Sequence, residues 1–133
     1  MIEQWITEVK KCSNTRELGM ILIHNGIVRA TSKEGRIVKG MHLSYDKEKL
    51  NSLITDFRKK EGIVAIKVWI NEGTLKAGDD IMCVLVAGRL RTNVLPVFED
   101  LISKIKKEVV SEDEFHRDNE LFSDGKVVTQ KDP

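Results

Sequence analysis

Two apolar runs in the middle of the chain constrain the fold most. They are Ile63–Ile70 and Asp80–Ala87, and both are rich in β-branched residues. Apolar runs of this length, without polar alternation, are typical of strands that are buried on both faces. The residues between them, 71–78, contain two glycines and are predicted to form a turn. A sheet built on such strands needs helices to cover it.

Three segments have the apolar spacing of helices. A short amphipathic helix is predicted over residues 2–9. A second helix, ended by Gly62, repeats its apolar residues every three or four positions, at Leu50, Leu53, Ile54 and Phe57. The last helix has one continuous apolar face, formed by Val94, Val97, Phe98, Leu101, Ile102 and Ile105. Asn93 is predicted to cap it, which places Pro96 in its first turn.

The remaining segments predict further strands and one solvated stretch. Strands are expected over Met20–Val28 and Ile37–Tyr45, and a final edge strand over Leu121–Val128. The highly charged segment Ser111–Glu120 is predicted to be solvated. The order of elements predicts an α+β fold, with helices packed on a mixed or antiparallel sheet. No internal repeat or linker divides the chain, so residues 1–133 are predicted to form a single domain.

Composition and charge argue against several classes of function. The 22 basic and 21 acidic residues nearly cancel, which gives no general reason to expect nucleic acid or a membrane surface as a partner. Cys12 and Cys83 are far apart, and no cysteines and histidines have zinc spacing, so no metal and no cofactor are predicted. The start of the chain does not resemble a signal peptide, and reduced thiols indicate a cytoplasmic protein.

One short segment offers a candidate binding residue. The strand predicted over Met20–Val28 contains Gly26 and is followed directly by Arg29. Glycine allows a bend or the close approach of another chain, and a guanidinium binds carboxylates or phosphates through two parallel hydrogen bonds. An ordinary strand with a surface arginine would look the same. The segment alone therefore leaves the question open.

Four blocks of the sequence, taken in order, resemble the catalytic (large) subunit family of molybdopterin synthase. They are Gly26–Arg29 after a strand, Leu43–Asp46 before a helix, Gly73–Asp79 before an apolar strand, and a helix ending in Ile105-Lys106. The resemblance runs from Gly19 to Lys106, with a weaker echo in Ser123–Val128. It implies an α+β fold of the α/β hammerhead type.

The resemblance also implies a reaction in molybdenum cofactor biosynthesis. In this family a small ubiquitin-like sulfur-carrier subunit carries a thiocarboxylate on its C-terminal Gly-Gly. The large subunit, expected to be a homodimer, transfers that sulfur to cyclic pyranopterin monophosphate, a pterin phosphate. Such a site needs a narrow channel for a glycine tail and cations for the phosphate and the thiocarboxylate.

The resemblance assigns roles to four basic residues. Lys106 matches the principal catalytic lysine, which acts as acid, base or nucleophile. Arg29 and Arg91 match residues that hold anionic groups, and Lys104 is a further candidate for substrate binding. Lys107 is close enough in sequence that Lys104, Lys106 or Lys107 could be the lysine that faces the pocket. A solvated helix lysine would have the same sequence pattern.

Three departures from the family pattern favour an alternative. A histidine and arginine before the last helix become Leu90-Arg91, and an earlier such pair becomes Ile70-Asn71. A second pocket lysine falls on Asp113, within a run of acids. Fewer cations and more carboxylates weaken phosphate binding. The chain could therefore be a diverged, catalytically weak member that acts as a partner- or ligand-binding module.

Overall fold

A computed structural model of the chain describes residues 1–12, 15–116, 120–123 and 126–129. It divides into two compact units. The first, here called the helical unit, comprises residues 1–24, 46–69 and 83–109. The second, here called the small-sheet unit, comprises residues 25–45, 70–82 and 110–133. Both helices and strands are present, so the predicted α+β class is confirmed.

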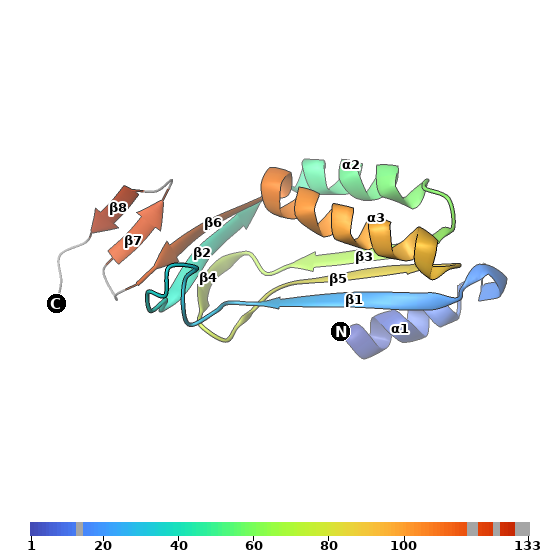
Figure 1. Cartoon of the computed structure of the whole chain (residues 1–133), viewed down its shortest axis with the longest axis horizontal. Helices are drawn as coiled ribbons and strands as arrows, with labels where there is room; N and C mark the ends of the chain where they lie inside the picture. The colour runs from blue at the N-terminus through green and yellow to red at the C-terminus, as the bar shows by residue number, and fades with distance from the viewer. Residues whose placement is uncertain (13–14, 117–119, 124–125, 130–133) are drawn as a thin grey trace. The chain divides into compact units, whose positions relative to one another are not determined.

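The helical unit contains the helices and most of one three-stranded sheet. The helices are α1 (Ile2–Lys10), η1 (Thr15–Glu17), α2 (Lys47–Arg58), α3 (Arg91–Lys104) and the π-helical turn η2 (Ile105–Val109). The strands are β1 (Met20–Ile27), β3 (Ile63–Ile70) and β5 (Asp80–Gly88), in the spatial order β1-β5-β3. Helix α1 covers one face of this sheet, and α2 and α3 cover the other (Figure 1).

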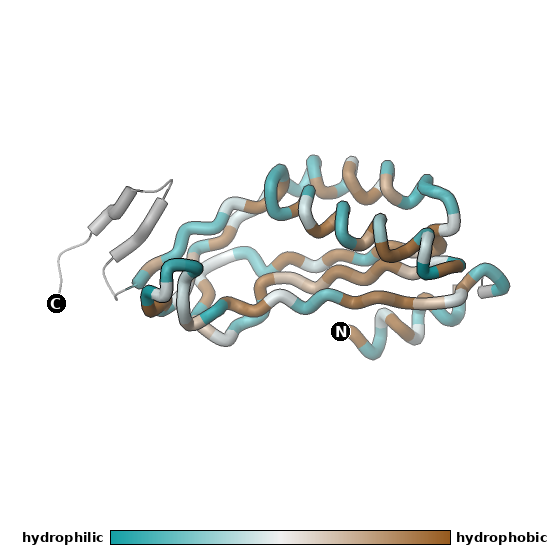
Figure 2. The backbone as a smooth tube through the Cα atoms, in the orientation of Figure 1, coloured by the Kyte–Doolittle hydropathy of each residue, from teal (hydrophilic) through white to brown (hydrophobic). Residues whose placement is uncertain are grey.

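The central position of β5 explains its unbroken apolar sequence. Every residue of β5 from Ile81 to Gly88 is buried, and the strand is coloured as hydrophobic over most of its length in Figure 2. Strand β3 lies at the edge of the sheet, and only Ile66 and Ile70 of its residues are fully buried. The prediction that Ile63–Ile70 is buried on both faces was therefore wrong. An edge strand has one neighbouring strand instead of two, which leaves its side chains half covered.

Alternation along the strands assigns residues to the two faces of the sheet. On the α1 face, Val9 packs with Leu85 and Ala87, and Ile21 and Ile23 pack against this cluster. On the other face, a Cβ atom added to Gly88 would lie 2.6 Å from Cγ2 of Val94 on α3. Because successive strand residues point to opposite faces, Val86, which lies between Leu85 and Ala87, faces α3.

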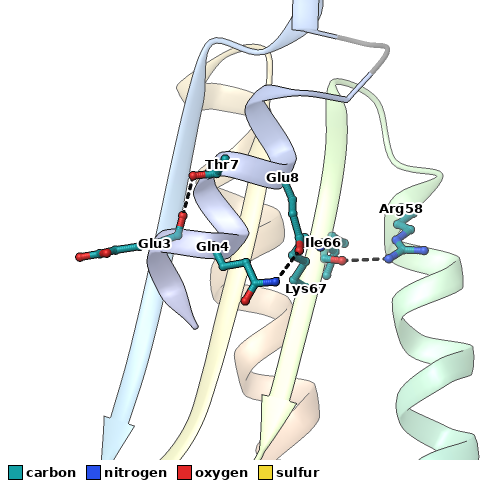
Figure 3. Close-up of polar contacts among 7 residues, drawn as sticks. All are labelled: Glu3, Gln4, Thr7, Glu8, Arg58, Ile66 and Lys67. Carbon is teal, nitrogen blue, oxygen red and sulfur yellow. Dashed lines mark hydrogen bonds and ion pairs between the residues drawn. The ribbon is translucent and has the colours of Figure 1, made fainter.

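Polar contacts fasten two helices to β3 (Figure 3). Lys67 Nζ lies 2.6 Å from Glu8 Oε2, which joins the strand to α1. Arg58 Nη2, in the last turn of α2, donates to the carbonyl oxygen of Ile66 at 2.9 Å. The arginine satisfies a backbone acceptor at the edge of the sheet and helps to protect that edge.

The start of α3 differs from the prediction. The helix begins at Arg91, with Leu90 at the N-cap position, instead of beginning after Asn93. The backbone nitrogens of Asn93 and Val94 both donate to the Leu90 carbonyl at 3.0 Å, so the first turn has already formed at these residues. Pro96 consequently lies inside the helix and not in its first turn.

The small-sheet unit is built on three antiparallel strands. They are β2 (Gly40–Tyr45), β4 (Gly73–Lys76) and β6 (Val110–Phe115), in the spatial order β4-β2-β6. One prediction was wrong here, because the turn predicted over residues 71–78 contains β4. The stretch predicted as solvated contains β6, whose side chains are exposed or half-buried. Strand β6 pairs with β2 over its whole length, so its backbone is paired although its side chains are charged. Residues 117–119 of that stretch lie outside the described residues.

The last segment forms a hairpin in place of one edge strand. Strands β7 (Glu120–Ser123) and β8 (Lys126–Thr129) pair antiparallel. Residues 124–125, which fall within the predicted strand and the weaker sequence echo, lie outside the described residues. Within the part of the chain that the structure describes, no helix has the length and apolar character needed to cross a membrane.

Candidate active site

The π-helical turn η2 presents two lysines at the end of α3. Ile105 and Val109 are buried and anchor the turn, whereas Lys106 and Lys107 between them are exposed. The Asp46 backbone nitrogen donates to the Val109 carbonyl at 3.0 Å, which ties the end of the turn to the start of α2. Short π-helical segments within helices are frequent at functional sites, because they redirect side chains without ending the helix.

The structure gives the neighbouring lysines different surroundings. Lys104 Nζ lies 3.8 Å from Asp100 Oδ2, one turn earlier on α3, and 5.4 Å from the centroid of the Phe57 ring on α2. Its ammonium therefore lies near a carboxylate and an aromatic face, but the ion pair is exposed and weak. Lys106, in contrast, acts electrostatically on His24.

His24 is a functional candidate that the sequence did not indicate. It is half-buried on β1, and its pKa is lowered, first by burial and second by the positive charge of Lys106. Both effects disfavour the imidazolium, so the ring is held neutral at pH 7. In the sequence His24 is an isolated histidine within an apolar strand. The one available signal was its alternation with Ile21 and Ile23, which places it on the other face of the sheet.

A cavity of about 510 Å³ lies on the α2 side of η2. Its lining is mainly acidic and includes Asp46, Glu48, Asp56 and Glu108, with Lys49 as its basic member. Carboxylates in this number repel a phosphate or thiocarboxylate. An anionic ligand is therefore disfavoured in this cavity.

Arg91 and Lys104 lie at opposite ends of α3. The helix has 14 residues and runs from one to the other. At about 1.5 Å per residue its ends are about 20 Å apart. A single chain therefore does not bring Arg91 to the lysines of η2.

Arg29 belongs to the small-sheet unit and follows an anchored residue. Val28 is buried, its nitrogen donates to the Asp79 carbonyl at 2.9 Å, and its carbonyl accepts from Gly78 at 2.8 Å. Arg29, next to it, is exposed. The backbone is thus fixed immediately before a guanidinium that is open to solvent. That Arg29 and Lys106 share one pocket stays a prediction.

Asp113 lies on β6 in the small-sheet unit. It is opposite His42 on β2, which is in turn opposite Thr74 on β4. His42 Nδ1 lies 2.7 Å from Thr74 Oγ1, and its ring centroid lies 5.0 Å from that of Phe115. Across the described ranges, no three histidine, cysteine, aspartate or glutamate side chains converge as metal ligands.

Comparisons with known proteins give one family match and one curated relative that each cover most of the chain. The family model described as "MoaE protein" matches residues 3–108. An uncharacterized protein of Methanocaldococcus jannaschii is 33% identical over 95 residues, which cover 68% of this chain and 80% of that protein.

Solved structures share the fold at low sequence identity. Molybdopterin synthase from Staphylococcus aureus has a TM-score of 0.67 and 18% identity, with 86% of this chain and 82% of that chain covered. A complex of subunits 1 and 2 of molybdopterin-converting factor from Helicobacter pylori has a TM-score of 0.66 and 16% identity, with 98% and 84% covered. The molybdopterin biosynthesis MoaE protein from Burkholderia ambifaria has a TM-score of 0.69 and 18% identity, with 89% and 78% covered.

Proposed function

This chain belongs to the MoaE protein family, and on that premise we propose that it is a molybdopterin synthase catalytic-subunit-like protein. In this proposal it transfers sulfur from a thiocarboxylated small subunit to cyclic pyranopterin monophosphate. The family match and the molybdopterin synthase neighbours support a role in molybdenum cofactor biosynthesis. The observation that carries the proposal is the extent of the family match, because residues 3–108 include α3 and Lys106.

Lys106 is the residue proposed to carry out the chemistry. It is exposed on a turn whose flanking residues, Ile105 and Val109, are buried, so its position is fixed while its ammonium remains accessible. A lysine in such a position can hold an anion, donate a proton, or act as a nucleophile once deprotonated. Lys104 is proposed as a secondary anion-binding group, because its ion pair with Asp100 is exposed and weak.

The two arginines are proposed to bind the anionic groups of the substrate and the carrier tail. Because α3 separates Arg91 from Lys106 within one chain, the Arg91 of a second copy would have to reach the Lys106 turn. This requirement supports the proposed homodimer. Arg29 is proposed to contribute its guanidinium from the end of β1, where the anchored Val28 holds the backbone in place.

The proposed partner is a small sulfur-carrier subunit. The Helicobacter pylori structure is a complex of two molybdopterin-converting factor subunits, and the present chain covers 84% of the matched chain in that complex. A carrier tail ending in two glycines can enter a channel too narrow for side chains.

A reconstitution assay tests the proposal. The chain is mixed with a thiocarboxylated small subunit and cyclic pyranopterin monophosphate, and dithiolene formation is followed over time. We expect turnover that depends on both the carrier and the thiocarboxylate. A carrier that ends in an ordinary carboxylate is the matched control and should give no product. Absence of turnover with a carrier that supports another large subunit would refute the proposal.

An acidic residue at position 113 favours a second function, the binding of a partner or ligand. Asp113 lies opposite His42 in an antiparallel sheet that contains the acidic residues of β6. A chain with this surface could bind a partner or ligand without catalysing transfer. Measured binding of the small subunit, together with no product under conditions where an active synthase works, would favour this alternative.

A further inference from the structure

The open edge of strand β3 borders a second cavity. This cavity, of about 310 Å³, is lined by Val64–Lys67 of β3, by Glu8, Val9 and Cys12 of α1, and by Arg58 of α2, all in the helical unit. Helices α1 and α2 cover opposite faces of the sheet (Figure 1), and β3 is its edge strand. A cavity that both helices line therefore lies along the edge of β3. Its volume is at the lower end of the range for small-molecule sites, about 300–1,000 Å³.

The charges that line this cavity do not cancel. Lys67 Nζ lies 2.6 Å from Glu8 Oε2, so the charges of that pair offset each other (Figure 3). Arg58 Nη2 donates to the Ile66 carbonyl oxygen at 2.9 Å, which fixes the guanidinium at the edge of the strand. A guanidinium carries further N–H donors, in a planar fork that matches a carboxylate. Arg58 thus supplies one positive charge in excess of the ion pair.

The rest of the lining is apolar. Val9 and Ile66 are 2% and 1% exposed, and Val64 and Ala65 are half-buried. Cys12, also half-buried, adds a small side chain of apolar character that ends in a thiol. A molecule that fills the cavity therefore meets an apolar wall and one excess cation.

We propose that this cavity binds a small monocarboxylate with a short apolar chain. The carboxylate would accept two parallel hydrogen bonds from Arg58, and the chain would lie against Val9 and Val64. None of these residues has a role in the proposed sulfur transfer, so the inference goes beyond that function and does not depend on it.

A single negative charge suits the cavity better than a double one. Glu8 lines the same cavity, and its carboxylate repels any anion that approaches Arg58. A monocarboxylate neutralises the one excess charge of the lining, whereas a phosphate dianion would leave a negative charge beside Glu8. Inorganic phosphate is therefore a probe that tests this preference.

The first arm of the test is an NMR titration of the full chain with hexanoate at pH 7. We expect saturable shifts at the backbone amides of Val9, Cys12 and Val64–Lys67. Hexanamide, which has the same chain without the charge, is the matched control and should cause no saturable shift at these amides. Inorganic phosphate should bind more weakly than hexanoate. No saturable shift with hexanoate, equal binding of hexanamide, or tighter binding of phosphate would overturn the proposal.

Variants of the two charged groups should change the affinity in opposite directions. Arg58→Met should weaken hexanoate binding at least about 10-fold, because a charge-assisted hydrogen bond is lost. Glu8→Gln should strengthen it by up to about 5-fold, because a repelling charge is removed. Since Arg58 also holds the Ile66 carbonyl, the gain in Glu8→Gln is the decisive result, as a disturbed fold does not bind more tightly. Lys106→Ala should bind as the wild type does. Wild-type affinity in both cavity variants would overturn the proposal.

The thiol of Cys12 reports whether the ligand occupies this cavity. Alkylation by iodoacetamide is followed by mass spectrometry, which separates the Cys12 peptide from that of the buried Cys83. Hexanoate should slow alkylation of Cys12 with a midpoint equal to the dissociation constant from NMR, and hexanamide should not. An unchanged alkylation rate at saturating hexanoate would place the ligand elsewhere and overturn the proposal.

Discussion

The helical unit and the small-sheet unit stabilise their strands by different means. Strand β5 of the first is an apolar run buried between helices on both faces. Strand β6 of the second carries Glu112, Asp113 and Glu114 in succession and is paired along its whole length with β2. The side chains of β5 are thus buried, whereas those of β6 are exposed or half-buried and its backbone is paired with β2. Apolar periodicity in a sequence reports the first kind of stabilisation and not the second.

The largest effect on the free energy of unfolding is expected from a substitution in the core of the helical unit. Leu101 on α3 is fully buried, so Leu101→Ala should lower the free energy of unfolding by about 3–5 kcal/mol through lost burial and a cavity. Leu95→Ala is the control on the same helix, because Leu95 is 41% exposed. Urea denaturation of both variants measures the difference. Equal destabilisation would show that α3 does not bury the face that the structure assigns to it.

A smaller loss of stability is expected when a side chain is added at Gly40, where the backbone of β2 lies close to β4 in the small-sheet unit. A Cβ atom added to Gly40 would lie 2.1 Å from the Leu75 carbonyl oxygen and 2.7 Å from the Phe115 ring. Gly40→Ala should therefore cost about 1–3 kcal/mol, because backbone on the neighbouring strand must shift. Hydrogen exchange should show faster exchange in β2 and β4 than in β5. Uniformly faster exchange in both units would contradict the separation between them.

A helix cap should contribute less still. Asp46 accepts a hydrogen bond from the Lys49 nitrogen at 3.1 Å at the start of α2. Asp46→Ala should cost about 1 kcal/mol in thermal or urea unfolding. Asp56→Ala, near the other end of the same helix, removes the same charge without removing a cap and should be close to neutral. A cost shared by both variants would point to charge, and not to capping, as the cause.

The smallest effect is the acid dependence of one surface ion pair. A hydrogen bond from Lys67 lowers the pKa of Glu8 below its ordinary value of 4.5. The folded state thus binds its proton less readily than the unfolded state does. The ion pair contributes stability above pH 4.5 and loses it as the pH falls through the lower folded value. The melting temperatures of wild type and Glu8→Gln should differ at pH 7 and converge at low pH. A difference that persists in acid would contradict this assignment.

The sequence predicted elements whose apolar residues are continuous or regularly spaced. Strand β3 begins and ends at the predicted residues, and α2 contains the predicted apolar stripe. Strand β6 was not predicted, because its stability depends on a partner strand from a distant part of the chain. The start of α3 was misplaced because the Leu90 carbonyl, and not the Asn93 side chain, organises the first turn.

The candidate site could be predicted only in part. Lys106, Lys104, Arg29 and Arg91 came from the family resemblance, and the lysines of α3 and η2 could not be told apart by spacing. The structure gives Lys104 an ion pair with Asp100 and a place over the Phe57 ring, whereas the positive charge of Lys106 lowers the pKa of His24. His24 itself escaped prediction because its significance depends on which face of the sheet it occupies.

The central claim is that Lys106, and not a neighbouring lysine, carries out the sulfur transfer. The direct measurement is the rate of dithiolene formation by wild type, Lys106→Ala and Lys107→Ala, each with the thiocarboxylated carrier and the pterin precursor. Lys107 is the matched control, because it is exposed on the same π-helical turn. Lys106→Ala should lose at least about 100-fold in rate while Lys107→Ala stays close to wild type. Full activity in Lys106→Ala would contradict the claim.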